Sequence, residues 1–331
     1  MDTGLIVGMV LLGLFGGYLI TSVLLLKYPL ILHKRKQLKF RCRHICHRGG
    51  AGERLENSMS AFKHACHIGT DMLEIDCHIT KDGQVVVTHD NNLQRLTGCD
   101  VLVSETNYED LPLLKPELRL DFDFGWVTRC SSDNEEDDLG QRRITLLREV
   151  FEQFPNTVVN IDIKVDNDEL IQSVANLISE FNRESLTVWG NKSGVVTNKC
   201  YTANPNIPVL ASIGTVVKWV ILFYTGLLPF IPIREAAYEI VMPSVILKEG
   251  KTRFQLSTKQ RALLKFIDWL LMSKQMIQHL SERGIQTYIW VLNEEDEFEK
   301  AFQLGATGVM TDFPTKLKQY LEPGHVLDNK T

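Results

Sequence analysis

Residues 72–90 constrain the fold more than any other stretch of the sequence. β-Branched residues alternate on both sides of a Lys-Asp-Gly tripeptide at 81–83, whose glycine accepts a positive φ, so the pattern predicts two neighbouring strands joined by a tight turn. In the first strand, Glu74, Asp76 and His78 stand at every second position. Because side chains alternate between the faces of a strand, these polar groups share one face and the intervening apolar residues take the other.

His89 ends the second apolar run and brings a fourth titratable side chain to the same end of the sheet. Two carboxylates with imidazoles nearby are typical of a site for a hard divalent cation that has an acid–base partner. The alternative is a polar strand face that only meets solvent. The spacing alone fits both interpretations.

From residue 44 onward, strand patterns alternate with helix patterns, which predicts a parallel sheet with crossover helices. A chain of 331 residues fits one TIM-type (β/α)8 barrel with an insertion. Nine strands are expected where the barrel needs eight, so one of them, a hairpin partner, is surplus. Besides the pair at 72–90, the expected strands are 44–48, 158–164, 186–189, 207–211, 240–242, 287–292 and 308–312, and the main helices are 59–68, 168–181, 274–283 and 294–304.

Residues 3–26 carry no charge, and as a helix they would extend about 36 Å, enough to span a bilayer. The sequence therefore predicts an N-terminal transmembrane helix. A cleaved signal peptide is the alternative, but the stretch lacks a basic segment before it and a small-residue cleavage site after it. The expected organisation is an anchor and basic neck at 1–43, a barrel at 44–320 and a C-terminal tail at 321–331.

The predicted anchor is followed by seven basic residues before position 44, whereas only Asp2 precedes it. The positive-inside rule then predicts that the body of the protein lies in the cytosol. The expected location of the helix is the endoplasmic reticulum or another intracellular membrane. The neck would suit anionic membrane lipids. The remainder of the chain is acidic, which argues against a nucleic-acid partner. The seven cysteines show no regular spacing and are expected to be reduced thiols.

Three segments depart from the barrel pattern. An insertion is expected at about 91–157, and its acidic run at 131–138 is predicted to be a solvated loop. Residues 219–233 are uncharged but short and broken by two prolines, which favours an interfacial hairpin or lid over a second span. The apolar stripe of residues 263–271 is predicted to pack inward as an outer barrel helix, with a membrane-facing helix as the alternative.

Several polar residues stand near the carboxyl ends of predicted strands, which is where α/β barrels carry their active sites. Each has an ordinary structural explanation: helix capping for an aspartate, an ion pair for an arginine, core packing for a tryptophan. Their coincidence at one rim is harder to explain in that way. These residues are His47, Arg48, Asp76, His89, Asp162, Lys164, Trp290 and Asp312.

The motifs at these positions resemble, in order and over about residues 44–320, the signature of the glycerophosphodiester phosphodiesterase family. With the anchor and the 219–233 segment, the chain is similar to the small membrane-bound branch associated with lysophospholipase D activity. The motifs are His47-Arg48-Gly49, Glu56-Asn57, Glu74-Ile75-Asp76, Lys81-Asp82-Gly83, residues 86–90, Asp162-Ile163-Lys164, Trp290-Val291-Leu292-Asn293 and Gly308–Asp312.

The resemblance implies a barrel, a bound divalent cation and the hydrolysis of phosphodiesters. Carried onto this chain, it makes Glu74, Asp76 and Asp162 the cation ligands and His47 and His89 the catalytic pair. Asp162 stands where many members have glutamate. Three carboxylates without cysteine or histidine favour Mg²⁺ or Ca²⁺ over zinc.

The chemistry is consistent with this resemblance. Arg48 and Lys164 would offset the negative charge that grows on the phosphoryl oxygens, and Trp290 would line the substrate pocket. One histidine would accept a proton from the nucleophile while the other donates one to the leaving alcohol.

The expected reaction converts lysophospholipids to lysophosphatidic acid and a free headgroup alcohol. One alternative is a phosphodiesterase for water-soluble, deacylated glycerophosphodiesters. Another is phospholipase C-type cleavage on the other side of the phosphate. A transmembrane scaffold without activity is disfavoured because no rim residue is missing.

Overall fold

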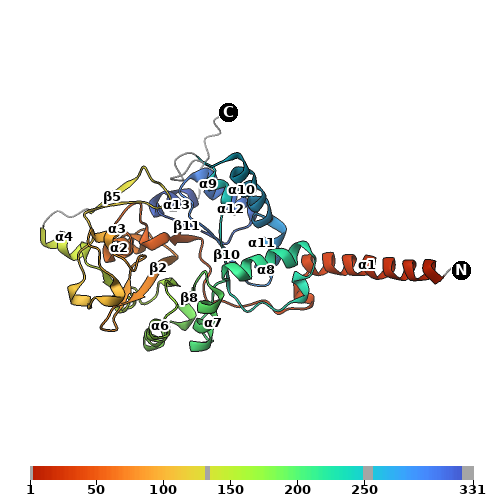
Figure 1. Ribbon diagram of the computed structural model, residues 1–331, viewed down its shortest axis with the longest axis horizontal. Helices are drawn as coiled ribbons and strands as arrows, with labels where there is room; N and C mark the ends of the chain where they lie inside the picture. Colours follow the sequence, from red (N-terminus) through yellow and green to blue (C-terminus); the bar gives the residue numbers. More distant parts are fainter. Residues whose placement is uncertain (1–2, 131–134, 249–255, 323–331) are drawn as a thin grey trace.

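The computed structural model describes residues 3–130, 135–248 and 256–322, and a parallel β-barrel forms its centre (Figure 1). Hydrogen-bonded neighbours follow one another around the ring, and the last strand pairs with the first. The strand predicted at 207–211 enters through two single bridges, from Val209 to Trp189 and from Leu210 to Ala237, which complete the eightfold ring. The other barrel strands are β1 His44–Cys46, β2 Met72–Ile79, β7 Val158–Ile163, β8 Thr187–Gly190, β9 Ala237–Val241, β10 Gln286–Trp290 and β11 Gly308–Thr311.

The surplus strand is the expected hairpin partner, β3 (Val85–Val87), which runs antiparallel to β2 outside the ring. It pairs on its other side with β6 (Thr145–Leu146). The prediction of a TIM-type barrel with one extra hairpin strand is therefore confirmed.

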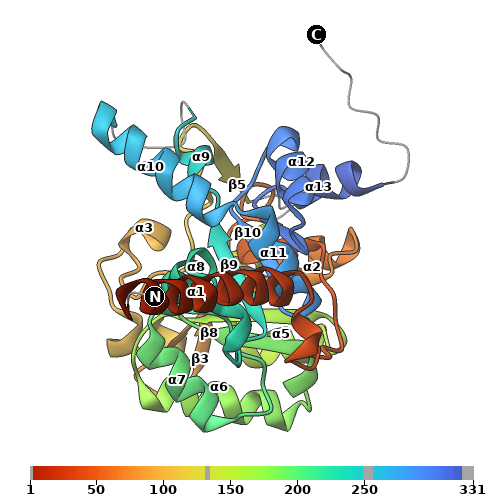
Figure 2. The same cartoon turned by 90° about the vertical axis from the view of Figure 1, so that its right-hand side faces the viewer.

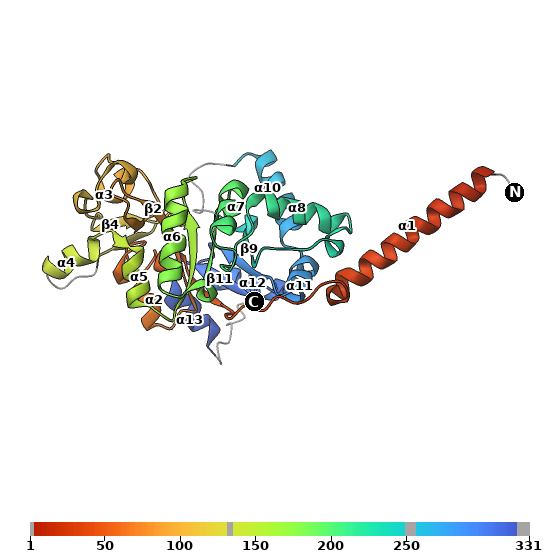
Figure 3. The same ribbon diagram turned by 90° about the horizontal axis from the view of Figure 1, so that it is seen from below.

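Helices cover the outside of the barrel (Figures 1 and 3). The Ser58 side chain accepts the backbone N–H of Ala61 and starts α2. The helices of the barrel body are α2 Met59–His67, α5 Leu147–Gln153, α6 Asp168–Glu180, α7 Gly194–Ala203, α8 Ile213–Tyr224, α9 Pro243–Ile246, α10 Thr258–Leu271, α11 Lys274–Glu282, α12 Glu295–Leu304 and α13 Pro314–Leu321.

Alternation along β2 separates the core from the site. Leu73, Ile75 and Cys77 belong to the apolar cluster between the sheet and its helices. The opposite face points into the barrel. There Met72 belongs to an apolar cluster, called the apolar floor, and Glu74 lies closer to the carboxyl end of the strand. The apolar floor consists of Cys42, Ile45, Met72, Val158, Val188, Leu210, Ala237, Tyr288 and Met310. Polar side chains thus occupy the layers of the barrel interior that lie between the apolar floor and the carboxyl ends of the strands.

The insertion between β3 and β7 folds against the carboxyl rim. It contains α3 (Gln94–Thr97), the β4–β5 hairpin (Glu117–Arg119 and Val127–Arg129) and α4 (Glu135–Arg142). The predicted acidic loop is wrong for residues 135–138, which begin α4, and residues 131–134 lie outside the described residues.

The N-terminal helix α1 (Thr3–Lys27) projects away from the barrel (Figure 3). It is the one helix in the described part of the chain that is long and apolar enough to cross a membrane. Its C-terminal end is attached to the body, because His279 Nδ1 on α11 lies 2.9 Å from the Leu26 carbonyl oxygen. Burial lowers the pKa of His279 to about 4, so the ring is neutral and its N–H can donate to that carbonyl.

The basic neck after α1 lies against the amino-terminal side of the barrel. The N–H of Lys36 donates to the Arg283 carbonyl (2.9 Å), and Phe40 packs on the apolar floor. Gln286 holds the neck twice: its Oε1 accepts the N–H of Cys42 (3.3 Å), and its Nε2 donates to the Phe40 carbonyl (2.6 Å). These bonds fix the base of α1 relative to the barrel.

The apolar segment predicted at 219–233 forms the end of α8, a turn and a short 3-10 helix at Leu228–Phe230. Its turn packs against α1, since the Ser22 hydroxyl donates to the Gly226 carbonyl (2.7 Å). The prediction of inward packing for the 263–271 stripe is wrong for Leu263 and Phe266, which are 57% and 54% exposed on α10. The prediction is confirmed for Leu270 and Leu271, which pack against the core cluster of the barrel.

Gln286→Leu should lower the thermal stability of the protein, because it removes both bonds to the neck and leaves the Cys42 N–H and Phe40 carbonyl without that partner. Such losses typically cost about 1–3 kcal/mol per buried group. The unfolding midpoint in detergent should fall clearly below that of Gln278→Leu, a matched change at an exposed position on α11. Equal midpoints would contradict the role given to the neck.

Candidate active site

The first strand delivers His47 and Arg48 to the rim through a sharp turn. β1 ends at Cys46 and the chain enters a 3-10 turn in which Arg48 has a positive φ of 51°. A non-glycine residue in this region is held there by its surroundings. Here the N–H of Arg48 donates to Glu74 Oε2 (2.9 Å), and its carbonyl accepts the N–H of Asn57 (2.9 Å).

His47 is oriented by a buried carboxylate from the last strand. Its Nδ1 lies 2.7 Å from Asp312 Oδ1, and Asn293 Nδ2 donates to the other oxygen of Asp312 (3.0 Å). Protonation at Nδ1 to donate to Asp312 leaves Nε2 of a neutral ring as the proton acceptor. The arrangement suits an imidazole that takes up a proton beside a carboxylate.

His89 has an equivalent partner from the insertion side. Its Nδ1 lies 2.7 Å from Asp90 Oδ1, and Arg95 Nε donates to Asp90 Oδ2 (2.6 Å). Arg95 also makes two bonds to Glu56, at 2.8 and 2.9 Å. The second imidazole is thus held by a chain of ion pairs, and it remains partly exposed at the rim.

The three predicted cation ligands lie on two adjacent strands. Asp76 of β2 and Asp162 of β7 are register partners, and Glu74 lies one layer deeper on β2. Lys164 bridges the two aspartates, with Nζ 3.1 Å from Asp76 Oδ1 and 2.9 Å from Asp162 Oδ2. Asn191 Nδ2 donates to the other oxygen of Asp162 (3.2 Å).

Burial and neighbouring charges set the protonation of this cluster. Burial raises the pKa of Glu74 well above its usual range, and the nearby Asp76 charge raises it further. Burial also opposes ionisation of Asp76, but Lys164 and Arg48 outweigh it and hold the Asp76 pKa below its ordinary value. Glu239, on β9, has its pKa raised to about 8 by burial and by Glu74. Burial thus opposes ionisation of all three carboxyl groups, and the neighbouring cations keep the charge on Asp76.

Arg48 is buried among carboxylates from three parts of the chain. Its Nη1 donates to Glu56 Oε1 and to Asp121 Oδ2, both at 2.9 Å, and its Nε lies 3.4 Å from Asp76 Oδ2. These partners leave Arg48 less accessible than Lys164 to an incoming phosphate. Phosphate binding by Arg48 stays a prediction.

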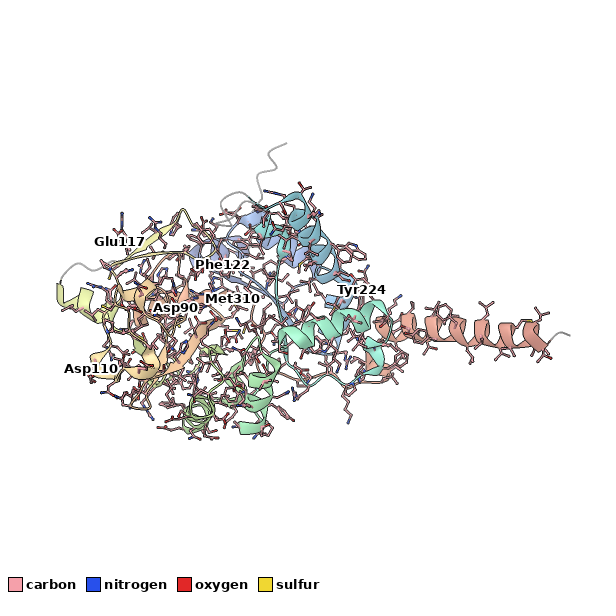
Figure 4. The ribbon with its side chains drawn as sticks, in the orientation of Figure 1. Asp90, Asp110, Glu117, Phe122, Tyr224 and Met310 are labelled. Carbon is pink, nitrogen blue, oxygen red and sulfur yellow. The ribbon has the colours of Figure 1, made fainter. Side chains whose placement is uncertain are left out.

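An aromatic wall closes one side of the rim. Phe122 of the insertion lies edge-on to His47 (5.9 Å between ring centroids) and to Trp290 (6.2 Å). Figure 4 shows Phe122 and Asp90 in the part of the molecule that faces away from α1. Phe122 thus lies between His47 and Trp290, and the role of Trp290 in a substrate pocket stays a prediction.

The eight rim residues predicted from the sequence are linked by contacts. Ion pairs join Arg48, Asp76, Lys164 and Asp162, and His47 is bonded to Asp312. His89 connects to Arg48 through Asp90, Arg95 and Glu56, and Trp290 connects to His47 through Phe122. The alternative of a solvated strand face is wrong, because Glu74, Asp76 and His78 are buried. Sequence reasoning missed Asp121, Phe122, Arg95, Asn191 and Glu239, which stand outside the strand-end pattern or carried no motif of their own.

The donor set fits a hard divalent cation. Asp76 and Asp162 are register partners on adjacent strands and Glu74 lies one layer deeper on β2, so three carboxyl groups, the oxygen ligands that Mg²⁺ and Ca²⁺ prefer, lie on neighbouring positions of the sheet. Among the described residues, no three acidic, histidine or cysteine side chains already surround one point as ligands of an ion would. Lys164 instead supplies the positive charge between Asp76 and Asp162.

Sequence comparison with known proteins identifies the family of this chain. The model of the glycerophosphoryl diester phosphodiesterase family matches residues 47–316. Lysophospholipase D GDPD1 of Homo sapiens is 55% identical over 312 residues, which cover 94% of this chain and 96% of the relative. Lysophospholipase D GDPD3 of Homo sapiens is 40% identical and covers 93% of each chain.

The fold is also similar to solved structures. The glycerophosphoryl diester phosphodiesterase domain of a Mycobacterium tuberculosis protein aligns with a TM-score of 0.63 and 15% identity, over 85% of this chain and 100% of that chain. At this identity the likeness concerns the barrel alone.

Glu74→Gln or Asp76→Asn should abolish stabilisation by added divalent cations. Each change removes a carboxylate charge from the three-carboxylate set. In thermal unfolding of chelator-treated protein, Mg²⁺ or Ca²⁺ at 100 times its dissociation constant should stabilise the wild type by about 2.7 kcal/mol and these variants by none. Asp166→Asn, at an exposed position beyond β7, is the matched control and should respond as wild type does. A full cation response in both site variants would remove these residues as ligands.

Proposed function

Because the chain belongs to the glycerophosphoryl diester phosphodiesterase family, we propose that it hydrolyses lysophospholipids to lysophosphatidic acid and the free headgroup alcohol. The observation that carries this substrate is the 55% identity, over nearly the whole chain, to the human lysophospholipase D. Phosphodiester hydrolysis itself follows from the family. Residues 44–320 form the catalytic barrel in this proposal, and residues 1–43 form its anchor and neck.

The two oriented histidines transfer the protons. Asp312 and Asp90 hold His47 and His89 through Nδ1, so each ring presents Nε2 to the reacting groups. One Nε2 accepts the proton of the attacking hydroxyl, and the other, protonated, donates to the oxygen of the leaving alcohol. Trp290 with Phe122 forms the wall of the substrate pocket.

Positive charge at the rim binds the phosphate. Lys164 is the more accessible cation and Arg48 the more deeply buried one, and both offset charge that develops on the phosphoryl oxygens. Glu74, Asp76 and Asp162 would hold one Mg²⁺ or Ca²⁺, which as a Lewis acid supplies further positive charge to those oxygens.

The neighbouring hydroxyl of the substrate is the proposed nucleophile. In a lysophospholipid, the free sn-2 hydroxyl lies next to the carbon that carries the phosphate, and a well-oriented internal group reaches effective concentrations of about 10⁵ M or more. Its oxygen bonds to phosphorus while the bond to the headgroup oxygen breaks, which gives a cyclic phosphate. Water opens this ring in a second step and yields lysophosphatidic acid.

A substrate panel analysed by mass spectrometry tests the proposal. Lysophosphatidylcholine should yield lysophosphatidic acid and choline, whereas its 2-deoxy analogue and the diacyl lipid should bind without turnover because each lacks the free hydroxyl. His47→Ala, which removes the acid–base group, should lower turnover by about 10²-fold or more. Monoacylglycerol and phosphocholine as products would overturn the proposed reaction, and rapid cleavage of the 2-deoxy analogue would overturn the internal nucleophile.

We propose that α1 anchors the protein in the endoplasmic reticulum or another intracellular membrane, with the barrel on the cytosolic side. The excess of basic residues on the body side of α1 supports this orientation. Asn191-Lys192-Ser193 has the pattern of a glycosylation acceptor, but Asn191 is buried and its Nδ2 donates to the Ile163 carbonyl. Absence of a glycan at this position is therefore expected on either side of the membrane.

Cys99 provides a direct test of orientation. It is exposed, whereas the other six free cysteines are buried or partly buried. On intact microsomes, a membrane-impermeant maleimide should label the wild type and leave Cys99→Ser unlabelled. Labelling that appears only after permeabilisation would place the barrel in the lumen.

A further inference from the structure

Exposed apolar side chains form a stripe along α8. Ile213, Val217, Ile221 and Tyr224 are between 42% and 60% exposed and recur at a spacing of three or four residues, which places them on one side of the helix. The opposite side packs against the barrel. Because α8 starts directly after the strand segment 207–211, the stripe begins at the catalytic rim and runs toward α1 (Figure 1).

A second exposed apolar stripe lies on α10. None of the 14 residues of this helix is buried, and Leu263, Phe266 and Trp269 are 57%, 54% and 63% exposed. Other residues attach the helix to the barrel: Asp268 Oδ1 accepts the N–H of Ser244 (2.8 Å), and Leu270 and Leu271 pack against the core cluster. Leu263, Phe266 and Trp269 therefore contribute little buried surface to the packing of α10 against the barrel.

The two stripes meet beside α1. The rings of Tyr224 and Trp269 stack with centroids 5.4 Å apart, and Phe266 stacks on Trp269 at 6.0 Å. Figure 2 shows α1 crossing in front of the barrel, with α8 directly behind it and α10 at the upper left. We call this continuous area the α8–α10 apolar surface; it consists of Ile213, Val217, Ile221, Tyr224, Leu227, Phe230, Leu263, Phe266 and Trp269.

The contact with α1 sets the depth of this surface relative to a bilayer. Tyr18 stacks on Phe230 (6.4 Å), and Ser22 donates to Gly226. Tyr18 precedes the end of α1 at Lys27 by nine residues, which is about 13 Å along the helix. If α1 crosses the membrane, the turn after α8 must therefore lie below the membrane surface, where its apolar side chains meet lipid.

The charge around the α8–α10 apolar surface also favours contact with a membrane. Lys218, Lys259, Arg261 and Lys265 are exposed on α8 and α10, next to the apolar stripes. Apolar and aromatic residues flanked by basic ones are typical of helices that lie in the interface of an anionic membrane. Tryptophan and tyrosine, here Trp269 and Tyr224, are enriched at that level.

We propose that the α8–α10 apolar surface docks into the interfacial layer of the membrane that α1 enters, and guides the acyl chain of a lipid substrate from the bilayer to the catalytic rim. The second part rests on the proposed lysophospholipid substrate. The first part depends on the surface alone.

Fluorescence quenching in lipid vesicles tests the docking without using activity. Full-length protein is reconstituted into vesicles of anionic phospholipid with brominated acyl chains, which quench tryptophan at short range. Trp269→Phe should remove a quenched component of the emission. Trp126→Phe, a matched change at a 46% exposed tryptophan on the far hairpin, should remove an unquenched one. Equal quenching for the wild type and both variants would overturn docking. Crosslinking between two copies of the chain through this surface, with Trp269 shielded from lipid, would also overturn it.

Kinetics test the guiding role. The double variant Phe266→Ser/Trp269→Ser should raise the apparent KM for lysophospholipid in vesicles on the order of tenfold, because it removes two apolar anchors. Hydrolysis of a water-soluble, deacylated glycerophosphodiester should stay unchanged. Val195→Ser on α7, 59% exposed outside the surface, is the control and should behave as wild type.

An unchanged KM in the double variant would overturn the guiding role. If the wild type fails to hydrolyse any lysophospholipid, the proposed function fails, while the quenching result still decides whether the surface docks.

Discussion

The buried guanidinium of Arg48 is the interaction on which the catalytic rim depends. It contacts carboxylates from the loop after β1, from β2 and from the insertion, through Glu56, Asp76 and Asp121. Without this cation, several acidic groups would be buried close together, and breaking a buried pair by removing one partner typically costs about 3–5 kcal/mol. The same charge network continues through Glu56 to Arg95 and so to the support of His89.

This network also explains how the insertion contributes to the barrel. Asp121 is bonded to Arg48, and the adjacent Phe122 packs between His47 and Trp290. The same short loop therefore neutralises charge and supplies an apolar wall. A rim that combines buried charged groups with neighbouring aromatic rings suits a substrate with a charged phosphate and an apolar remainder.

The relation between the barrel and α1 is equally specific. The neck is hydrogen-bonded to Gln286 and Arg283, and the turn after α8 is bonded to Ser22. α1 is thus held at both the neck and the α8 turn. Such attachment fixes which side of the barrel faces α1, and the exposed stripes of α8 and α10 lie beside the same helix.

Local sequence determined the barrel strands, the surplus hairpin, the apolar N-terminal helix and the rim residues, because side-chain alternation and strand ends are encoded within a few neighbouring positions. Tertiary structure alone decided which distant groups meet. Asp312 reaches His47 across 265 positions and Asp121 reaches Arg48 across 73, and no local period encodes such contacts. The same applies to α10, whose periodic stripe predicted burial: periodicity shows that a helix has an apolar side, whereas the arrangement of the other elements decides whether protein covers it.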